Sequence, residues 1–512
     1  MTNRRFGTAN KFGTSNQFGV STATSPRLKF ALEFDWDNNH EFDGFNDATS
    51  RLLSWTQRRG REFFFNSGGD GFQAVNEGEM TFTLKNTDRR FDPYYSAGSI
   101  FAGLQKNILC RFMALDESTA TLYPEFFGYV TDVRPKYGGL DVTEIVVQDG
   151  VKKLKDKNIS SSSVYAGNQY DQQIVTALSV AGWVDGYNVD ETLSDTMPYH
   201  WFNGSPAFNE LMALVQATFG LFFVDKQGIA VYKSRISSDI SVMDLTEADI
   251  EYDYGIQAPS PREVVRNSIK VYARARSAQA GVELWRLVDV PLLAGGTGSP
   301  IWATYSYNGE EVPVTSVTEP VASTDFTAHQ NADGSGTNYT ANISWTRTGF
   351  ATSSKLVPTN SGPDAYLTLM KLRGTAIAAD QYTYATATDD ESIGVYGERE
   401  LVINSDWLQS FNTAQEQADL LIDRFASLRF FPRIKVKKSS LDKIFAPDLF
   451  DLVSVNFSTK GVTGEMRIGF MEKSWNSNSP DSVECVYYFE PNLTISSSGV
   501  WIFPVTLPAT LG

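Results

Sequence analysis

The chain has few residues of the kinds that disulfide frameworks, metal sites and membrane spans need. Its two cysteines, Cys110 and Cys485, lie in apolar alternating runs, which is typical of small buried hydrophobic residues. No apolar run approaches the ~18 residues of a membrane-spanning helix. The N-terminus lacks the apolar core of a signal peptide. We therefore expect a folded chain with no membrane span that does not use the signal-peptide export route.

Catalytic signatures are also scarce. The three histidines, His40, His200 and His329, neighbour no cysteine and form no His-Glu-x-x-His pattern, which argues against zinc and against Cys/His catalysis. The sequence has no Gly-x-Ser-x-Gly motif, no phosphate-binding loop and no dinucleotide-binding glycine motif. We expect no catalytic residue, no cofactor and no metal site. A cell-wall hydrolase stays the enzymatic alternative, although a carboxylate pair carries almost no information in a chain with 60 acidic residues.

Basic residues are outnumbered. The net charge is −16, from 60 acidic and 44 basic residues, and the Lys/Arg pairs are scattered. This balance argues against wrapping DNA as the main task, although it allows a surface that stands beside DNA without holding it. The oxygen-bearing residues Asp35, Asp37, Asn39, Glu41 and Asp43 lie two apart. His40 stands where a calcium loop needs glycine, so a solvated strand face is the preferred interpretation.

A repeat opens the chain. Phenylalanine followed by glycine recurs every six residues, at Phe6, Phe12 and Phe18. An even period places the three rings on one side of an extended chain, about 20 Å apart. Glycine after each ring lets another backbone come close. We interpret residues 1–26 as an arm whose rings dock on a neighbouring subunit; the alternative is a disordered terminus with chance similarity.

Strand patterns with a period of two dominate the rest of the chain, as in Met80, Phe82 and Leu84. Residues 27–150 are predicted to form an antiparallel β domain, a barrel or a sandwich. Residues 151–254 are predicted to form a small α/β domain. Its two helices are expected to have Asp171 and Ser205 as N-caps, and its hairpin is expected to turn at 226–228.

The second half continues the β pattern around an insertion. Residues 255–277 and 381–492 predict a second β domain with a helix at 413–428, begun by a capping box of Thr413 and Glu416. Residues 278–380, rich in Thr, Ser, Gly and Asn, predict an inserted all-β module. Residues 493–512 are predicted to be a loop-like C-terminal tail. The predicted fold class is mainly β with a small α/β part.

The inserted module contains aromatic residues that suit sugar binding. Their rings could stack on a glycan of a host receptor, or they could fill the core of the module instead. The four residues are Trp302, Tyr305, Tyr307 and Trp345.

The order of several motifs resembles a known family. A strand ending in Leu-x-Asn, a Phe-Asp-Pro loop, a Phe-x-Gly strand and an acidic turn before a leucine follow one another. The chain thereby resembles the tail-hub and minor tail proteins of tailed bacteriophages, over most of its length outside the arm and the module. The matching residues are Leu84, Asn86, Phe91, Asp92, Pro93, Phe127, Gly128, Asp149 and Leu154.

The resemblance implies a structural virion protein at the tail tip, assembled in the host cytoplasm. It implies two hub-type β-barrel domains per chain and a homotrimer, whose ring joins the tail tube or distal tail protein ring to tape-measure, tip and fibre proteins. DNA would pass through without tight binding, and the ring would gate its channel. The alternatives are a hexameric distal tail protein and a receptor- or glycan-binding tail protein that acts through residues 278–380.

Overall fold

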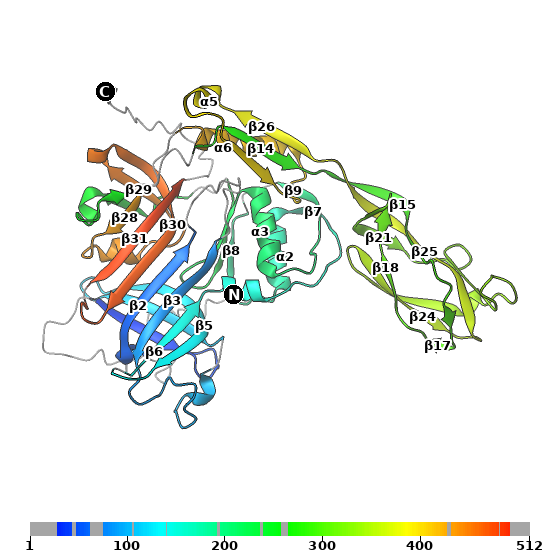
Figure 1. Ribbon diagram of the computed structural model, residues 1–512, viewed down its shortest axis with the longest axis horizontal. Coiled ribbons are helices and arrows are strands. Elements are labelled where there is room, and N and C mark those ends of the chain that lie inside the picture. The colour runs from blue at the N-terminus through cyan, green and yellow to red at the C-terminus, as the bar shows by residue number, and fades with distance from the viewer. Residues whose placement is uncertain are drawn as a thin grey trace.

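The structure is a computed structural model, and strands dominate it (Figure 1). This confirms the predicted, mainly β fold class. No helix among the described residues is long and apolar enough to cross a membrane. The residues described are 28–42, 48–61, 75–104, 107–139, 141–191, 195–235, 239–257, 265–427, 432–480 and 482–491.

The main body is one twelve-stranded sheet. Its strand order is β1-β4-β5-β6-β3-β2-β30-β31-β28-β13, with β29 paired to β30 and β12 paired to β29. Strands from the two ends of the chain therefore join where β2 pairs with β30. The strands are β1 (Leu28–Phe34), β2 (Leu52–Gly60), β3 (Asn76–Lys85), β4 (Leu109–Asp116), β5 (Thr121–Lys136), β6 (Val142–Gln148), β12 (Met243–Thr246), β13 (Ile256–Gln257), β28 (Arg433–Val436), β29 (Leu452–Phe457), β30 (Val462–Asn476) and β31 (Val483–Pro491).

The alternation of the sequence explains this sheet. Met80, Phe82 and Leu84 on β3 are fully buried, and the residues between them are only partly buried. Their core continues without a break into the C-terminal strands, where it includes Val453 and Ile468. The two β parts of the chain thus share one apolar core, in addition to one sheet.

The α/β unit follows β6. A three-stranded sheet, β10-β11-β8, and the antiparallel pair β7-β9 pack with two helices, α2 and α3. The predicted hairpin at 226–228 is present, since β10 and β11 pair on either side of it. The elements are α1 (Val151–Asp156), β7 (Tyr165–Gln169), α2 (Tyr170–Val180), β8 (Tyr187–Val189), β9 (Thr196–His200), α3 (Ala207–Thr218), β10 (Leu221–Val224) and β11 (Ala230–Lys233).

Both predicted N-caps in this unit are wrong by one or two residues. Gln169 caps α2 in a reciprocal capping box with Gln172, so that Asp171 lies inside the helix and is buried. Pro206 precedes α3, which begins at Ala207, and the Ser205 hydroxyl donates to Glu210 Oε1 at 2.8 Å instead of capping.

The predicted second β domain is divided in the structure. Strands β14, β26 and β27 form a separate three-stranded sheet, and α6 packs on it. The buried residues of this sheet and of α6, such as Ile269 and Leu421, belong to the core of the α/β unit. The elements are β14 (Ser268–Ala273), β26 (Thr383–Thr388), α5 (Asp390–Tyr396), β27 (Glu400–Asn404), α6 (Phe411–Phe425) and α7 (Leu441–Phe445), the last between β28 and β29.

The helix predicted at 413–428 begins earlier. Ser410 is its N-cap, because the Ser410 Oγ accepts a hydrogen bond from the Thr413 backbone N–H at 3.3 Å. The capping box of Thr413 and Glu416 is therefore wrong.

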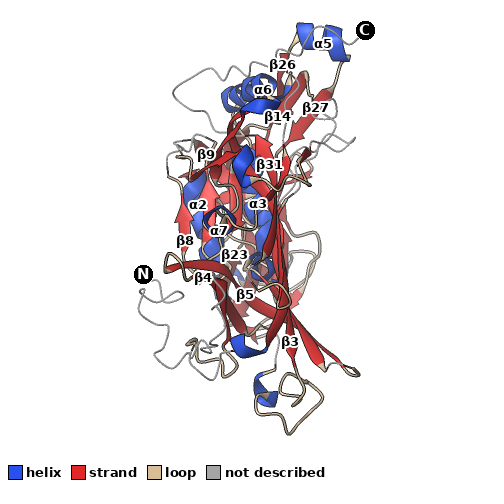
Figure 2. Cartoon of the chain, turned by 90° about the vertical axis from the view of Figure 1, so that its left-hand side faces the viewer, coloured by secondary structure: helices blue, strands red, loops and turns tan. Residues whose placement is uncertain are grey.

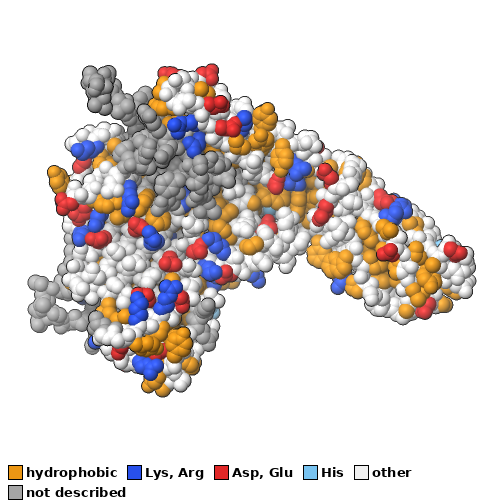
Figure 3. All heavy atoms as spheres, viewed as in Figure 1, with side chains coloured by type: hydrophobic (Ala, Val, Ile, Leu, Met, Phe, Trp, Pro, Cys, Tyr) orange, Lys and Arg blue, Asp and Glu red, His pale blue; other side chains and the backbone are white. Residues whose placement is uncertain are grey.

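The inserted module is all-β, has its own core and projects from the body (Figures 1 and 3). The chain enters it after β14 and leaves it before β26. Its strands are β15 (Arg276–Arg286), β16 (Leu292–Leu293), β17 (Gly296–Thr297), β18 (Ile301–Thr304), β19 (Ser306–Tyr307), β20 (Glu310–Glu311), β21 (Val314–Thr318), β22 (Phe326–His329), β23 (Ile343–Gly349), β24 (Ser353–Asn360) and β25 (Ala365–Ala379). Short 3-10 turns lie at Thr49–Arg51, Phe101–Gly103, Glu247–Asp249, Thr340–Asn342 and Ser458–Lys460.

Candidate functional site

The seam between β2 and β30 brings the two halves of the chain together. The pairing runs from Ser54 with Asn476 to Gly60 with Phe470. Gly60 has a φ of 105°, and a Cβ atom added there would lie 2.2 Å from the Gly469 carbonyl oxygen. Only glycine fits this close backbone approach, so the seam depends on that residue.

Ion pairs cross the body at this seam. The Lys473 ammonium on β30 lies 2.7 Å and 2.9 Å from the two carboxylate oxygens of Glu125 on β5. Both side chains are fully buried. Arg61 and Glu490 form a second buried pair at 3.1 Å. A buried charge is tolerated when its partner is in place, so these pairs tie the alignment of the N-terminal strands to that of the C-terminal strands.

A third buried pair connects three parts of the chain. Arg59 Nη1 on β2 lies 2.6 Å from Asp448 Oδ1 in the segment after α7, and its Nη2 donates to the Val224 carbonyl on β10 at 2.8 Å. The Lys226 backbone N–H donates to the other oxygen of Asp448 at 2.7 Å. The contacts of Asp448 with Arg59 and Lys226 therefore connect the C-terminal part of the chain to the N-terminal strands and to the α/β unit.

Two further carboxyl groups at this junction have raised pKa values. Burial raises the pKa of Asp149 to about 7. The pKa of Asp225 is raised to about 6, mainly by burial and secondly by the neighbouring Asp448 carboxylate. Burial would also raise the pKa of Asp448, but Arg59 and Lys226 hold it below its ordinary value. The junction therefore changes its charge near neutral pH.

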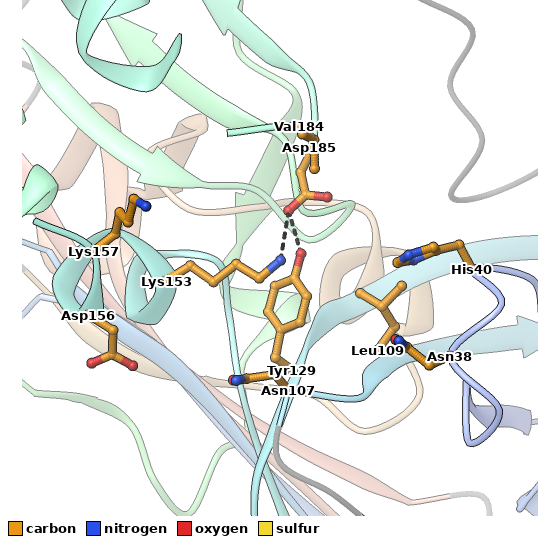
Figure 4. Close-up of a pocket in the computed structure, with 10 residues that line it drawn as sticks. All are labelled: Asn38, His40, Asn107, Leu109, Tyr129, Lys153, Asp156, Lys157, Val184 and Asp185. Atoms are coloured by element: carbon orange, nitrogen blue, oxygen red, sulfur yellow. Dashed lines mark hydrogen bonds and ion pairs between the residues drawn. The ribbon is translucent and has the colours of Figure 1, made fainter. Parts of the chain in front are cut away.

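A cavity of about 460 Å³ lies between the N-terminal strands and the α/β unit (Figure 4). The Tyr129 hydroxyl donates to the Asp185 carboxylate, and the Lys153 ammonium lies 3.6 Å from the centre of the Tyr129 ring and 3.8 Å from Asp185 Oδ2. The lining residues are Asn38, His40, Asn107, Leu109, Tyr129, Lys153, Asp156, Lys157, Val184 and Asp185.

One wall of this cavity belongs to the acidic segment 35–43. The described part of the segment forms turns rather than the predicted strand face, because the buried Asp35 carboxylate accepts the backbone N–H groups of Asn39 at 3.0 Å and His40 at 2.9 Å. Within the described ranges, no group of three His, Cys, Asp or Glu side chains is placed to hold a metal ion.

The predicted docking residues Phe6, Phe12 and Phe18 lie outside the described residues. The four aromatic residues of the module do not form one platform. Tyr305 has no exposed surface and its hydroxyl contacts Ser354, so the predicted stacking of a ligand on Tyr305 is wrong. Tyr307 and Trp345 pack against the module core, where Trp345 meets Phe326 edge to face at 5.7 Å.

Trp302 alone among the four is largely exposed, at 58%. Its ring stacks on Phe350, with ring centres 6.0 Å apart and an interplanar angle of 22°. Figure 3 shows hydrophobic side chains on the surface of the projecting module, with charged side chains between them.

Sequence reasoning missed the residues of the seam. Lys473 and Glu125 are 348 positions apart, and Arg59 and Asp448 are 389 apart, so no local spacing connects them. The one available signal was the presence of Arg59 and Lys473 within alternating strand patterns, at positions where apolar residues are usual.

Comparisons with known proteins gave matches among solved structures only. No protein-family model and no curated protein matches the chain. A 43 kDa tail protein of prophage MuSo2 from Shewanella oneidensis is similar at 12% identity and a TM-score of 0.49, covering 91% of this chain and 99% of that one. A tail protein from Neisseria meningitidis MC58 is similar at 9% identity and a TM-score of 0.47, covering 90% and 96%.

A third similar structure is the prophage tail protein gp18 from Listeria monocytogenes EGD-e. Its identity to this chain is 10% and its TM-score is 0.40, with 90% of this chain and 94% of that chain covered.

Proposed function

We propose that this chain is a tail-hub or minor tail protein, a structural component that closes a trimeric ring at the tip of a phage tail. The observation that carries the proposal is the joining of β2 to β30. It places two groups of antiparallel strands, one from each end of the chain, in one sheet with one core. Three copies would then present six such groups, which suits a ring that meets a six-fold tail tube on one side and three-fold tip components on the other.

The charge of the chain supports a channel that DNA passes without being held. Each copy carries −16, and a ring of three carries three times that charge. A lumen lined by carboxylates repels phosphate groups, whereas a basic lumen would retain them. In this proposal the ring gates the channel and binds the tail tube or distal tail protein ring, the tape-measure protein and fibre proteins. It performs no catalysis, and a cleared zone in a cell-wall zymogram would contradict that part.

Electron microscopy of the purified full chain tests the proposal. We expect class averages of a ring with an axial opening and three-fold symmetry. A six-fold ring would favour the hexameric distal tail protein instead. Separate single copies without an opening at all concentrations would contradict both forms of the proposal.

The exposed ring pair on the module favours a second candidate function. Trp302, stacked on Phe350, offers a flat aromatic surface of the kind on which sugars are bound, so that the module would carry receptor or glycan recognition. Trp302→Ala in the full chain should then reduce binding to host cell surfaces at least tenfold. Val288→Ala is the matched control, because Val288 is also in the module and 93% exposed. Equal binding by both variants would contradict this candidate.

A further inference from the structure

The sheet formed by β17, β18, β23 and β24 in the inserted module has two different faces. On one face, Ala303 and Leu356 are buried in the module core. Because side chains alternate along a strand, their neighbours Trp302 and Lys355 point to the other face. We call this surface the Trp302 face, and its residues are Trp302, Thr304, Thr346, Thr348 and Lys355.

A tryptophan, a lysine and a threonine form one row across this face. Trp302 on β18 pairs with Lys355 on β24, and Lys355 pairs with Thr348 on β23. Residues directly opposite each other on antiparallel strands have Cβ atoms about 5 Å apart, and their side chains lie on the same face. Trp302 and Thr348 are both exposed. A ligand that stacks on the Trp302 ring therefore has an ammonium group and a hydroxyl group beside it.

The ammonium group of Lys355 is available to a ligand. Within the described part of the chain, the Lys355 side chain forms no ion pair and no hydrogen bond. The other cation of these strands, Arg347, lies on the core side of β23 and is paired with Glu319 at 3.2 Å. Lys355 therefore supplies the uncompensated positive charge of the Trp302 face.

The strands of this sheet lack acidic residues, although the whole chain carries −16. Residues 290–309 include no charged residue, and the only charged residues within 334–363 are Arg347 and Lys355. These two ranges contain all four strands and the turn between β23 and β24. The net charge of the chain repels an anionic ligand, whereas this sheet offers such a ligand a free ammonium group and no carboxylate.

The turn that carries Phe350, on which Trp302 stacks, is held on two sides. The next residue, Ala351, is fully buried, and its backbone N–H donates to the Ser162 carbonyl of the α/β unit at 2.7 Å. The Ala351 carbonyl accepts from the Val314 N–H at 2.8 Å. The ring pair is therefore ordered before a ligand binds, which lowers the entropic cost of binding. The module that carries it extends to one side of the body in Figure 1 and lies behind the body in Figure 2.

We propose that the Trp302 face binds an acidic glycan. A sugar ring stacks on Trp302, the Lys355 ammonium binds a carboxylate or phosphate group of the glycan, and the Thr348 hydroxyl bonds a sugar hydroxyl group. The inference rests on the second candidate function, glycan recognition by the module, and it adds the chemical class of the glycan.

Binding of the purified full chain to immobilised bacterial polysaccharides of known composition tests this proposal. The set contains polymers with uronic acids, polymers with phosphate groups and neutral polymers. We expect binding to acidic polymers, and the class that is bound identifies the anion as carboxylate or phosphate. The affinity should fall at least fivefold between about 50 mM and about 500 mM NaCl, because salt screens the contact with Lys355. Binding that is confined to neutral polymers would overturn the inference.

Charge variants of the full chain sharpen the test. Lys355→Gln should lower the affinity for the bound acidic polymer at least fivefold, because it removes the positive charge and keeps a side chain of similar length. The control is Lys371→Gln, since Lys371 is a partly buried lysine on β25, outside this sheet; its affinity should stay within twofold. Unchanged affinity in Lys355→Gln would contradict the inference.

Trp302→Ala separates this inference from the candidate function on which it rests. Binding of neutral polymers that is lost in Trp302→Ala would refute only the acidic class and would leave glycan recognition in place. Binding to no polymer of the set would refute glycan recognition by the module, and the inference with it.

Discussion

At the scale of single residues, buried charges couple distant parts of the chain. Lys473 and Glu125 have almost no contact with water, and each is stabilised by the other. Arg59 is equally buried, and its guanidinium pairs with Asp448 and donates a hydrogen bond to the Val224 carbonyl. Removing one member of such a pair leaves a charge in a medium of low dielectric constant, which costs far more than the loss of an exposed pair.

Lys473→Ala should lower the free energy of unfolding by about 3–5 kcal/mol, because Glu125 would then be buried without a partner. Urea denaturation followed by tryptophan fluorescence measures the change. The double variant Lys473→Met, Glu125→Leu should recover much of the loss. The matched control is Arg134→Ala, which breaks an exposed pair with Asp132 and should cost less than about 1 kcal/mol. Equal losses in both single variants would contradict the role given to the buried pair.

Asp149 should make stability depend on pH. Its pKa is raised to about 7 from an ordinary value of 3.8, so the folded state holds the proton more tightly than the unfolded state. Its contribution is therefore most favourable below about pH 4 and is lost as the pH rises through 7. Asp149→Asn cannot lose a proton, although it gives up an acceptor for the Gly78 or Val151 N–H.

We expect Asp149→Asn to have a lower unfolding free energy than the unsubstituted chain at pH 4. This difference should become smaller as the pH rises to 7, because only the unsubstituted chain loses the contribution of Asp149. Unfolding free energies of both chains at several pH values measure this difference. A deficit that stays constant over the window would show that Asp149 is ionised throughout, as its two backbone donors would favour.

At the scale of elements, alternation in the sequence predicts strands well and their partners poorly. Met80, Phe82 and Leu84 indicate β3 because each strand buries every second residue. Pairing of β2 with β30 joins residues more than 400 positions apart, and no local pattern fixes that register. The sequence pattern places β14, β26 and β27 in the second β domain, but their buried residues belong to the core of the α/β unit. Strands with a period of two look alike whichever core they cover.

The module shows the same limit for side chains. Tyr305 and Trp302 are three positions apart in a segment rich in polar residues, yet the first is buried and the second is exposed. Strand alternation separates them, because an odd spacing puts two residues on opposite faces. Which face covers the core depends on β24, with which β18 pairs, and that partner is not visible in the sequence near 302.

Gly60→Ala tests the join between β2 and β30. The added methyl group would lie 2.2 Å from the Gly469 carbonyl oxygen, so the backbones must separate. Gly281→Ala is the control, because Gly281 also has a positive φ, 72°, but has no atom within 4 Å of an added Cβ. The control should cost about 1–2 kcal/mol from the strained backbone alone. The loss of unfolding free energy in Gly60→Ala, measured by chemical denaturation, should clearly exceed the loss in Gly281→Ala. Equal losses in the two variants would contradict the role given to the close approach of Gly60 and Gly469.

At the scale of the whole molecule, the chain combines a joined β body, an α/β unit and a projecting module. The body supplies two strand groups, so that a ring of three copies would present six, and the module extends outward from β14 and β26 (Figure 1). The acidic net charge would keep DNA from adhering to such a ring. In the proposed function, this arrangement serves the assembly of a ring.

The number of copies in the assembled particle tests this account most directly. Native mass spectrometry of the purified full chain, at several concentrations and at low ionic strength, should give a particle of three chains. A particle that remains one chain under all of these conditions would contradict the trimeric ring.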